Sequence, residues 1–567
     1  MRHLFGLFCL VIFASDGNSQ TSVVSTGSFN RSVPKVGFNL NSLTKPTWQN
    51  SSFLDSVKAL HPQLIRYPGG TESQYFDWQA GGIISQNFWT SGQLFNHGYL
   101  STVPQVPHTL TQLLYLYQQS GIKPVFCLNM LTKSLSDQLL MLKTADSLGI
   151  PIEFIELGNE LYFTDQDFVN KYPQPVDYVL DIKNNWIPAL DSLYPNALIS
   201  VIGSYSGSLD LNNNPVPARI STWNDTLLAR NPGGNAFTFH YYIPPNTTTF
   251  LNPNITQALA APFRHWPTFK ANTINLINNG MECWITEYNL SDGNLNNYAI
   301  ASSWAHGLYT ASFFSLMLEE PKISMLLNHQ ITGSPAFASL ASYTLFGDTI
   351  SNRMTAEGNA MRLIHKAIGG NQSATKLQFS LNPMITVGPT NYPSLIGWKF
   401  ENGSNKEFIF LNLSGTTFQL DLASLQNASL SYEQITAANP LQLNLTTQNL
   451  SVIKGSFTNT LSVAPYSLTY GGPPQVQSTN EELAVSEKID VFPNPASSEM
   501  TVRVHSDTEE SILVEIFGTD GKKVFQKSCI LSSGELSIKT ASFAPGLYLI
   551  NLDSEKGWRK QVKIQVE

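Results

Sequence analysis

The sequence predicts an α/β chain of three parts: a (β/α)8 barrel, an all-β sandwich and a small C-terminal β-sandwich-like domain. Three observations lead to this fold class. Short, nearly continuous apolar runs separated by helical or loop segments fill the first part, which is typical of parallel strands covered on both faces. From about residue 376 the runs alternate and are separated by turn residues. A Pro- and polar-rich segment then precedes a last β-rich stretch.

Eight apolar runs are expected to form the barrel strands. They read VGFNL (36–40), LIRYPGG (64–70), KPVFCLNM (123–130), FIELGNE (154–160), LISVIGS (198–204), AFTFHYY (236–242), ECWITEYN (282–289) and ISMLLNHQI (323–331). Helical segments precede the third and fourth runs and end near Gly121 and Gly149, as helix C-termini often do. Such a barrel carries its active site at the carboxyl ends of the strands.

Composition shifts set the expected boundaries. The chain of 567 residues is too long for one hydrophobic core. In the β-rich parts, Asn402-Gly403 and Asp520-Gly521 read as hairpin turns. The expected parts are a signal peptide at 1–20, the barrel at 21–373, the β-sandwich at 374–472, a linker at 473–488 and the last domain at 489–567.

The N-terminus predicts export. A basic start is followed by an apolar run from Leu4 to about Ala14 and then by polar residues, which is the pattern of a secretory signal peptide. This run is shorter than the roughly 20 residues of a spanning helix. No later stretch reads as membrane-spanning.

Charge and cysteine content exclude several classes of protein. Apolar residues make up 42% of the chain, which excludes a disordered protein, and a net charge of −8 argues against nucleic acid as a partner. After the signal peptide only Cys127, Cys283 and Cys529 remain, too few for a disulfide scaffold. No Cys/His spacing resembles a zinc site, so we expect neither a metal nor an organic cofactor.

Two glutamates lie at the expected catalytic edge of the barrel. Asn159 and Glu160 follow the fourth apolar run, and Glu287 lies near the end of the seventh. Hydrolysis of a glycosidic bond needs one carboxylic acid to protonate the leaving oxygen and a second carboxylate to attack, or to activate water at, the anomeric carbon. Helix capping or a structural ion pair is the alternative for each glutamate.

The motifs ELGNE and ITEYN, preceded by IRYPGGT, resemble glycoside hydrolases of clan A. Within the clan they are most similar to the α-L-arabinofuranosidase and heparanase-like β-glucuronidase families, which also append a β-sandwich ending in a strand like VAPYSLTY. The resemblance covers about residues 36–472. It implies that Glu160 is the acid/base, that Glu287 is the nucleophile and that the anomeric configuration is retained.

Four further residues are expected to bind substrate or support the glutamates. The resemblance implies that Asn159 binds the sugar 2-hydroxyl. Arg66 ends the second run, where a permanent cation keeps a nucleophile ionised. His240 and Tyr242 share one face of the sixth run, and the resemblance implies that the tyrosine bonds the nucleophile and the histidine lines the site. Purely structural hydrogen bonds or ion pairs remain the alternative for each residue.

Two more sugar contacts are expected from position alone. Asn129 ends the third run and is a candidate to bind a sugar hydroxyl. Trp78, with Tyr75, follows the second run and could form a stacking wall, with core packing as the alternative. The insert from Trp78 to His108 is expected to decide between exo and endo action.

Other residues are expected to face the barrel interior. Glu156 has the strand parity of Glu160 and would need a cationic or hydrogen-bonding partner there. Cys127 and Cys283 have the parity of Asn129 and Glu287, respectively. The eighth run lacks the tryptophan seen in many clan members; the candidates to replace it are Asn328, His329 and Gln330.

The last eighty or so residues resemble a type IX secretion C-terminal sorting domain. The resemblance is carried by VFPNPASSEMTV, SFAPGLYLINL and the basic end WRKQVKIQV. It implies export to the outer cell surface or the medium and makes the type IX secretion machinery a partner. A generic carbohydrate-binding β-module is the alternative.

The expected function is that of a secreted retaining glycoside hydrolase that cleaves a polysaccharide or oligosaccharide by double displacement. A catalytically inactive glycan-binding surface protein on the same fold is the alternative. A polysaccharide lyase would use a Tyr/His base with a charge neutraliser, which fits the paired glutamates poorly.

Overall fold

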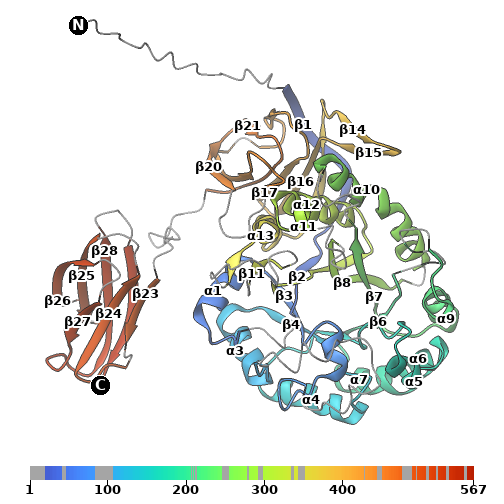
Figure 1. Ribbon diagram of the computed structural model, residues 1–567, viewed down its shortest axis with the longest axis horizontal. Coiled ribbons are helices and arrows are strands. Elements are labelled where there is room, and N and C mark those ends of the chain that lie inside the picture. The colour runs from blue at the N-terminus through green and yellow to red at the C-terminus, as the bar shows by residue number, and fades with distance from the viewer. Residues whose placement is uncertain are drawn as a thin grey trace, which may run out of the picture. The chain divides into compact units, whose positions relative to one another are not determined.

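Figure 1 shows the computed structural model of the protein. The chain forms two compact units, residues 1–474 and 475–567. The structure describes residues 20–40, 46–83, 106–205, 207, 210, 214–244, 254–277, 280–290, 298–333, 338–341, 352–426, 428–442, 450–474, 488–492, 495–505, 510–518, 522–531, 535–554 and 559–567. The expected signal peptide up to residue 19, most of the insert between Trp78 and His108, most of the linker and the turn at Asp520-Gly521 lie outside these residues.

The barrel prediction is confirmed. Eight parallel strands form a closed barrel in chain order, and the first pairs with the last. All eight predicted runs supply one strand each. The strands are β2 (Lys35–Asn39), β3 (Leu64–Tyr67), β4 (Lys123–Cys127), β5 (Phe154–Glu156), β6 (Leu198–Ile202), β7 (Ala236–Ile243), β8 (Glu282–Leu290) and β9 (Ile323–Asn328).

The barrel interior changes from apolar to polar along the strands. An apolar cluster is formed by residues from seven strands: Leu64, Val125, Phe154, Leu198, Ala236, Trp284, Met325 and Leu327. Successive side chains of a strand alternate between its two faces, so residues two positions further on share this face. There the strands carry Arg66, Cys127, Glu156, Ser200, Thr238 and Thr286, all of them buried. The polar layer therefore lies toward the carboxyl ends of the strands.

Helices and short strands connect the barrel strands. The predicted helix before β4 ends at Gly121 with φ 72°, and Gly149 with φ 85° follows the helix before β5; glycine adopts this left-handed conformation readily. The longer helices are α1 (Ser51–Ala59), α3 (Leu110–Ser120), α4 (Leu135–Ser147), α9 (Trp223–Arg230), α10 (Ile255–Asn272), α12 (Trp304–Leu318) and α13 (Ala356–Ile368). Shorter elements are η2 (Thr71–Tyr75), α5 (Gln166–Lys171), α6 (Pro175–Asp181), η4 (Ile182–Trp186), α7 (Ile187–Leu193), α8 (Ala218–Ser221), η5 (Ile274–Leu276), α11 (Tyr298–Ala301), β10 (Thr332–Gly333), β11 (Leu340–Ala341) and β12 (Arg353–Met354).

The sandwich region is a nine-stranded sheet with strand order β20-β19-β22-β17-β16-β13-β1-β18-β21. Its turn at Asn402-Gly403 joins two antiparallel strands, and Gly403 has φ 61°. The strands are β1 (Gln20–Ser32), β13 (Ser373–Phe379), β16 (Leu395–Asn402), β17 (Asn405–Asn412), β18 (Phe418–Asp421), β19 (Leu430–Thr436), β20 (Ser451–Phe457), β21 (Thr460–Val463) and β22 (Ser467–Gly472). A separate hairpin consists of β14 (Met384–Val387) and β15 (Thr390–Pro393).

One strand lies in a different part from the one that the sequence suggested. Residues 21–32 were expected in the barrel, but β1 pairs with β13 and with β18 of the sandwich sheet. The physical reason is the pattern of β1, whose side chains alternate between buried and exposed near its start instead of forming a continuous apolar run. The described part of the chain therefore begins in the sandwich sheet and enters the barrel at β2.

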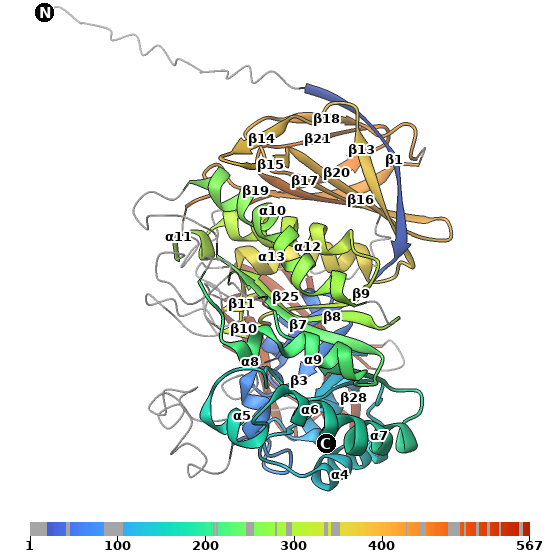
Figure 2. The same ribbon diagram turned by 90° about the vertical axis from the view of Figure 1, so that its right-hand side faces the viewer.

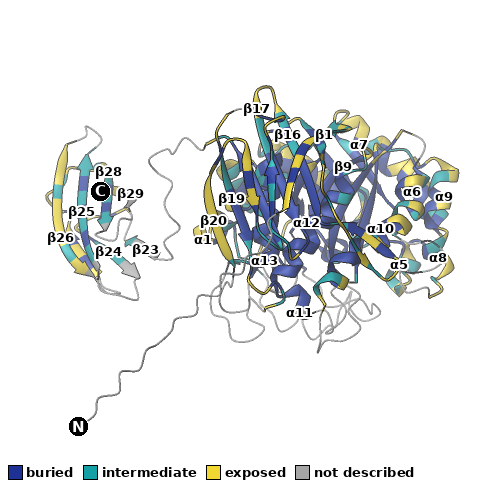
Figure 3. Cartoon of the chain, turned by 90° about the horizontal axis from the view of Figure 1, so that it is seen from above, coloured by how far each residue is buried: buried dark blue, intermediate teal, exposed yellow. Residues whose placement is uncertain are grey.

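Helices α10, α12 and α13 lie between the barrel and the sandwich sheet (Figure 2). Because α12 is covered on both sides, almost all of its residues are buried (Figure 3). The indole of Trp304, at the start of α12, donates a hydrogen bond to the carbonyl of Tyr466 at 2.7 Å. Arg362 of α13 forms an ion pair with Glu433 of β19. One cluster of buried apolar residues includes Trp304 of α12 and Trp398 of β16, so the barrel and the sandwich share a hydrophobic core.

We expect Trp304→Ala to destabilise this unit by about 3–5 kcal/mol, since it removes a fully buried indole and leaves a cavity. Trp304→Phe keeps most of the apolar contact and is the matched control, with a smaller loss expected. Urea unfolding of the full chain measures both. A loss below about 1 kcal/mol for the alanine variant would contradict the shared core.

The C-terminal unit is a pair of small antiparallel sheets around its own core. One sheet has β23 (Lys488–Phe492), β24 (Glu499–His505) and β27 (Glu535–Lys539). The other has β25 (Glu510–Gly518), β26 (Lys523–Leu531), β28 (Gly546–Ser554) and β29 (Arg559–Val566). Apolar side chains from both sheets, such as Val502 and Val514, pack together. This matches the predicted small β-sandwich-like domain.

Candidate active site

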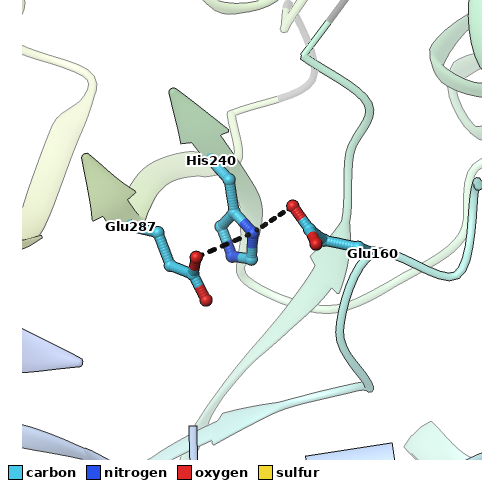
Figure 4. Close-up of side chains that lie close together, drawn as sticks. All are labelled: Glu160, His240 and Glu287. Atoms are coloured by element: carbon cyan, nitrogen blue, oxygen red, sulfur yellow. Dashed lines mark hydrogen bonds and ion pairs between the residues drawn. The ribbon is translucent and has the colours of Figure 1, made fainter. Parts of the chain in front are cut away.

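The two predicted glutamates converge at the carboxyl ends of the barrel strands, with His240 between them (Figure 4). Glu160 lies in the loop after β5, His240 lies in β7 and Glu287 lies in β8. The Nδ1 atom of His240 is 2.9 Å from Oε1 of Glu160 and 3.8 Å from Oε2 of Glu287. One carboxylate oxygen of Glu160 lies within 4.8 Å of one of Glu287.

The Glu287 carboxylate is held by polar groups on both of its oxygens. Its Oε1 accepts a hydrogen bond from Nη1 of Arg66 at 2.6 Å and one from Nδ2 of Asn39 at 3.1 Å. Its Oε2 accepts one from the Tyr242 hydroxyl at 2.5 Å, and Nδ1 of His329 lies 3.5 Å away. The carboxylate is thus oriented by groups from several different strands.

These contacts keep Glu287 ionised. Burial alone would raise the pKa of its carboxyl group, because the charged form loses water. Electrostatic interactions with His240, His329 and Arg66 and the hydrogen bond from Tyr242 outweigh that cost, so that the pKa of Glu287 is well below its usual range. A carboxylate with these properties is suited to act as a nucleophile.

We expect Tyr242→Phe to raise the pKa of Glu287, since the variant loses a hydrogen bond to the ionised form. The acidic limb of the pH profile of kcat/KM should move to higher pH, and kcat should fall by roughly tenfold. Activity on an aryl glycoside between pH 3 and 9 measures both. Tyr241→Phe is the control, because that ring packs among buried apolar residues. An unchanged acidic limb in the Tyr242 variant would contradict the assignment.

Arg66 is fully buried and contacts several residues of the site. Its Nε contacts Oε2 of Glu156 at 2.5 Å, and its Nη2 donates to Oδ1 of Asn159 at 2.7 Å and contacts Sγ of Cys127 at 3.4 Å. Together with its bond to Glu287, these contacts occupy every side of the guanidinium. Glu156 thus has the cationic partner that its interior position requires.

Local backbone geometry directs the loop after β5 toward the site. Glu160 has φ 47° and Gly158 has φ 96°, both in the left-handed region, which non-glycine residues adopt at a cost. Gln74 donates a hydrogen bond from Nε2 to the carbonyl of Asn159 and so anchors the loop. The hydroxyl of Tyr162 donates to Oε1 of Glu160 at 3.2 Å. The Glu160 side chain is 14% exposed and therefore remains accessible.

Thr286 is a site residue that the sequence did not indicate. The pairing of β7 with β8 shifts by one residue, so that Phe239 is opposite Ile285 and His240 is opposite Glu287. Thr286 is the extra residue of β8, with no residue of β7 opposite it. The side chains of Thr286 and Glu287 both lie in the site. Strict alternation would place the two side chains on opposite faces.

The same irregularity explains a wrong prediction. Cys283 was expected in the barrel interior with Glu287, but it packs in the large outer core, and its neighbour Trp284 belongs to the interior cluster. Cys127, by contrast, lies in the interior beside Arg66.

Asn39 and His329 complete the surroundings of Glu287. Asn39 was overlooked, although its place at the end of the first apolar run was an available signal. His329 is the one of three candidates in the eighth run that approaches the glutamates, with Nδ1 2.8 Å from Nδ2 of Asn39. Asn328 is fully buried and donates to Glu357 instead.

Two predicted sugar contacts do not join this network in the described part of the chain. Asn129 holds the loop after β4: its Nδ2 donates to the carbonyl of Phe76 at 3.1 Å and to the Thr132 hydroxyl at 2.8 Å. Trp78 is 8% exposed and packs in the large core. The reason is that loop side chains after a strand end are not directed by strand alternation.

Within the described part of the chain, the residues that could hold a metal are the two glutamates and His240. Among the described residues, Glu160, His240 and Glu287 are grouped closely enough to offer three ligand atoms to one ion. Arg66 already supplies positive charge to Glu287 at 2.6 Å. We therefore keep a metal-free site as our prediction.

Comparisons with known proteins bear on the C-terminal unit first. Residues 490–567 match the family described as a secretion system C-terminal sorting domain. This unit is a type IX sorting domain. It directs the protein to the cell surface or the extracellular space, as predicted. None of the described helices is long and apolar enough to cross a membrane.

Solved structures bear on the first unit. An α-L-arabinofuranosidase of family 51 from Bifidobacterium longum has a TM-score of 0.61 at 14% identity, with 80% of this chain and 100% of that chain covered. The α-L-arabinofuranosidase from Thermotoga maritima in complex with arabinose has a TM-score of 0.57 at 12% identity, with 80% and 99% covered. A 4-O-α-L-rhamnosyl-β-D-glucuronidase from Fusarium oxysporum 12S has a TM-score of 0.52 at 13% identity, with 80% and 100% covered.

These likenesses show that the chain shares the fold of glycoside hydrolases with a barrel and an appended sandwich. No curated protein sequence matches the chain.

Proposed function

We propose that this protein is an exported retaining glycoside hydrolase with Glu287 as the nucleophile and Glu160 as the acid/base. The observation that carries the proposal is the separation of the two carboxylates, whose nearest oxygens lie within 4.8 Å. Retaining enzymes hold their carboxyl groups about 5–5.5 Å apart, whereas inverting enzymes leave about 6.5–9.5 Å for a water molecule.

The environments of the two carboxylates support different roles. Glu287 is bonded by Arg66 and Tyr242, which favour its ionised form. Glu160 accepts a hydrogen bond from Tyr162 and lies 2.9 Å from Nδ1 of His240, and no arginine or lysine among the described residues forms an ion pair with it. Two carboxyl groups in contrasting environments are the usual basis for one nucleophile and one proton donor.

The reaction would proceed by double displacement. Glu287 attacks the anomeric carbon and breaks the bond to the leaving oxygen, while Glu160 gives that oxygen its proton. Glu160 then takes a proton from water, and the resulting hydroxide displaces Glu287 and releases the sugar with its configuration retained.

Asn159 is suited to assist both steps. Its Oδ1 accepts from Arg66, which turns Nδ2 away from that cation. The Nδ2 atom is buried and has no hydrogen-bond partner within the described chain. We assign it to the sugar 2-hydroxyl, a contact that strengthens in the transition state of such reactions.

The substrate class follows from the motifs and the fold. The neighbouring structures include enzymes named for α-L-arabinofuranosides and for a β-D-glucuronide. We therefore propose a polysaccharide or oligosaccharide that carries one of these two sugars.

The test is release of sugar by the purified full chain. Aryl α-L-arabinofuranosides, aryl β-D-glucuronides and a set of plant, algal and animal polysaccharides are incubated with the wild type and with Glu287→Gln. Release by the wild type alone is expected. If neither protein releases sugar and both bind one polymer equally, the glycan-binding alternative replaces the proposal.

A further inference from the structure

We propose that Glu156 and Thr286 are positioning residues that fix the tautomer of His240, so that Nδ1 of this histidine accepts a hydrogen bond from protonated Glu160. The inference rests on the proposed function of Glu160, and it goes beyond that function by assigning a role to two buried residues that do not reach the substrate. It follows from a chain of four hydrogen-bonding groups, Glu156, Thr286, His240 and Glu160.

The first link fixes the state of Glu156. This residue is fully buried, and its Oε2 contacts Nε of Arg66 at 2.5 Å. A buried carboxylate so close to a permanent cation is ionised. Ionised carboxylates only accept hydrogen bonds, so Glu156 has no proton to give.

The second link sets the direction of the Thr286 hydroxyl. Its Oγ1 lies 3.0 Å from Oε1 of Glu156 and 3.0 Å from Nε2 of His240. A hydroxyl has one proton, and Glu156 can only accept it. The Thr286 oxygen is therefore left as an acceptor toward His240, and the Nε2 atom of His240 must carry the hydrogen.

The third link sets the role of Nδ1. With hydrogen fixed on Nε2, the neutral imidazole has a lone pair on Nδ1, 2.9 Å from Oε1 of Glu160. A neutral His240 then accepts a hydrogen bond from protonated Glu160, and a protonated His240 donates one to ionised Glu160. In both states one proton lies on the bond between the two side chains.

Several charges face this pair. The groups around His240 are Glu156 and Glu160 from β5 and its loop, Glu287 from β8 and Arg66 from β3. Burial would lower the pKa of His240, but the negative charge of Glu287 and the bond to Glu160 raise it above its usual value. Tyr162 donates a hydrogen bond to Glu160, and Tyr205 and Asp165 interact with it electrostatically.

The consequence is a defined proton donor. The Nε2–H tautomer stabilises protonated Glu160, whereas the Nδ1–H tautomer would donate to Glu160 and stabilise its ionised form. The chain from Glu156 therefore keeps a hydrogen-bond acceptor, Nδ1, beside the proton that Glu160 gives to a leaving group.

The decisive variant is Glu156→Gln. Its amide oxygen can still accept from Arg66, while its amide nitrogen donates to Thr286. Thr286 must then donate to Nε2 of His240, which moves the hydrogen of the neutral imidazole to Nδ1. Thr286→Val removes the link altogether, and Thr286→Ser restores the hydroxyl and is the matched control.

The first readout is ¹⁵N NMR of the full chain labelled at histidine, with the signals of His240 assigned through His240→Gln. The wild type and Thr286→Ser should show the Nε2–H tautomer at His240, and Glu156→Gln should show the Nδ1–H tautomer. An Nδ1–H tautomer in the wild type would overturn the proposal, as would an unchanged tautomer in Glu156→Gln. If a variant fails to fold, the wild-type spectrum alone still decides.

The second readout is the pH profile of kcat/KM on the substrate found by the screen. The basic limb should move to lower pH by about one unit in Glu156→Gln and Thr286→Val, and return in Thr286→Ser. A purely structural role would lower the rate without moving this limb, and that result would also overturn the proposal. If the wild type hydrolyses no glycoside, the proposed function fails, whereas the NMR result still decides the tautomer.

Discussion

Glu287→Gly should lose essentially all turnover, with kcat lower by roughly 10⁴-fold or more, because no group remains to attack the anomeric carbon. In the structure this carboxylate is the one bonded to Arg66 and Tyr242, so its loss leaves their donors facing a cavity. Added azide can enter that cavity and attack an activated aryl glycoside in its place.

The product of this rescue tests the role of Glu287. A single attack by azide gives a glycosyl azide of inverted configuration, which NMR of the product identifies. Glu153→Gly is the control, since Glu153 lies partly exposed in an ion pair with Lys123 outside the site. Retained turnover in Glu287→Gly, or an azide product of retained configuration, would contradict the nucleophile assignment.

Glu160→Ala should show a loss that depends on the leaving group. Proton donation to the leaving oxygen contributes about 10²–10⁴-fold, so substrates with poorly acidic leaving groups should lose activity by that factor. An aryl glycoside with a strongly acidic leaving group needs no proton, and its first step should be nearly unaffected. Azide should then speed the second step and give a glycosyl azide of retained configuration.

Steady-state rates across a series of aryl glycosides measure this dependence. Tyr162→Phe is the matched control, because it removes only the hydroxyl that donates to Glu160. A uniform loss across the whole series in Glu160→Ala would mean that Glu160 does not protonate the leaving group.

The barrel was predictable because its strands carry a strong signal. Each strand is buried on both faces, so runs such as AFTFHYY stand out from the segments around them. Since parallel strands end at one edge, Arg66, His240 and Glu287 could be expected to converge without knowledge of the helices. The motifs then added the separate roles that we predict for the two glutamates.

Thr286 could not be predicted in the same way. Alternation along β8 assigns it to the face opposite Glu287, and only the shifted pairing with β7 brings both to the site. A shift of this kind depends on the neighbouring strand and leaves no mark in the local sequence. The misplacement of Cys283 has the same origin.

The positions of loop side chains and of strand β1 were the other features that the sequence did not predict. Asn129 and Trp78 follow strands, and their side chains are used to pack and hold the loops. The alternating pattern of β1 indicates a strand with one exposed face, and its pairing with β13 and β18 then identifies its place in the sandwich sheet. These assignments depend on contacts between residues far apart in the sequence.

The most direct measurement of the central claim is mass spectrometry of the full chain during turnover of a 2-deoxy-2-fluoro glycoside of the sugar found by the screen. The fluorine slows both steps, and an activated leaving group lets the first one proceed, so that a glycosyl-enzyme accumulates in a retaining enzyme. The account predicts one added glycosyl group, located on Glu287 by peptide mapping. A label on any other residue, or hydrolysis with inverted configuration and no label, would contradict it.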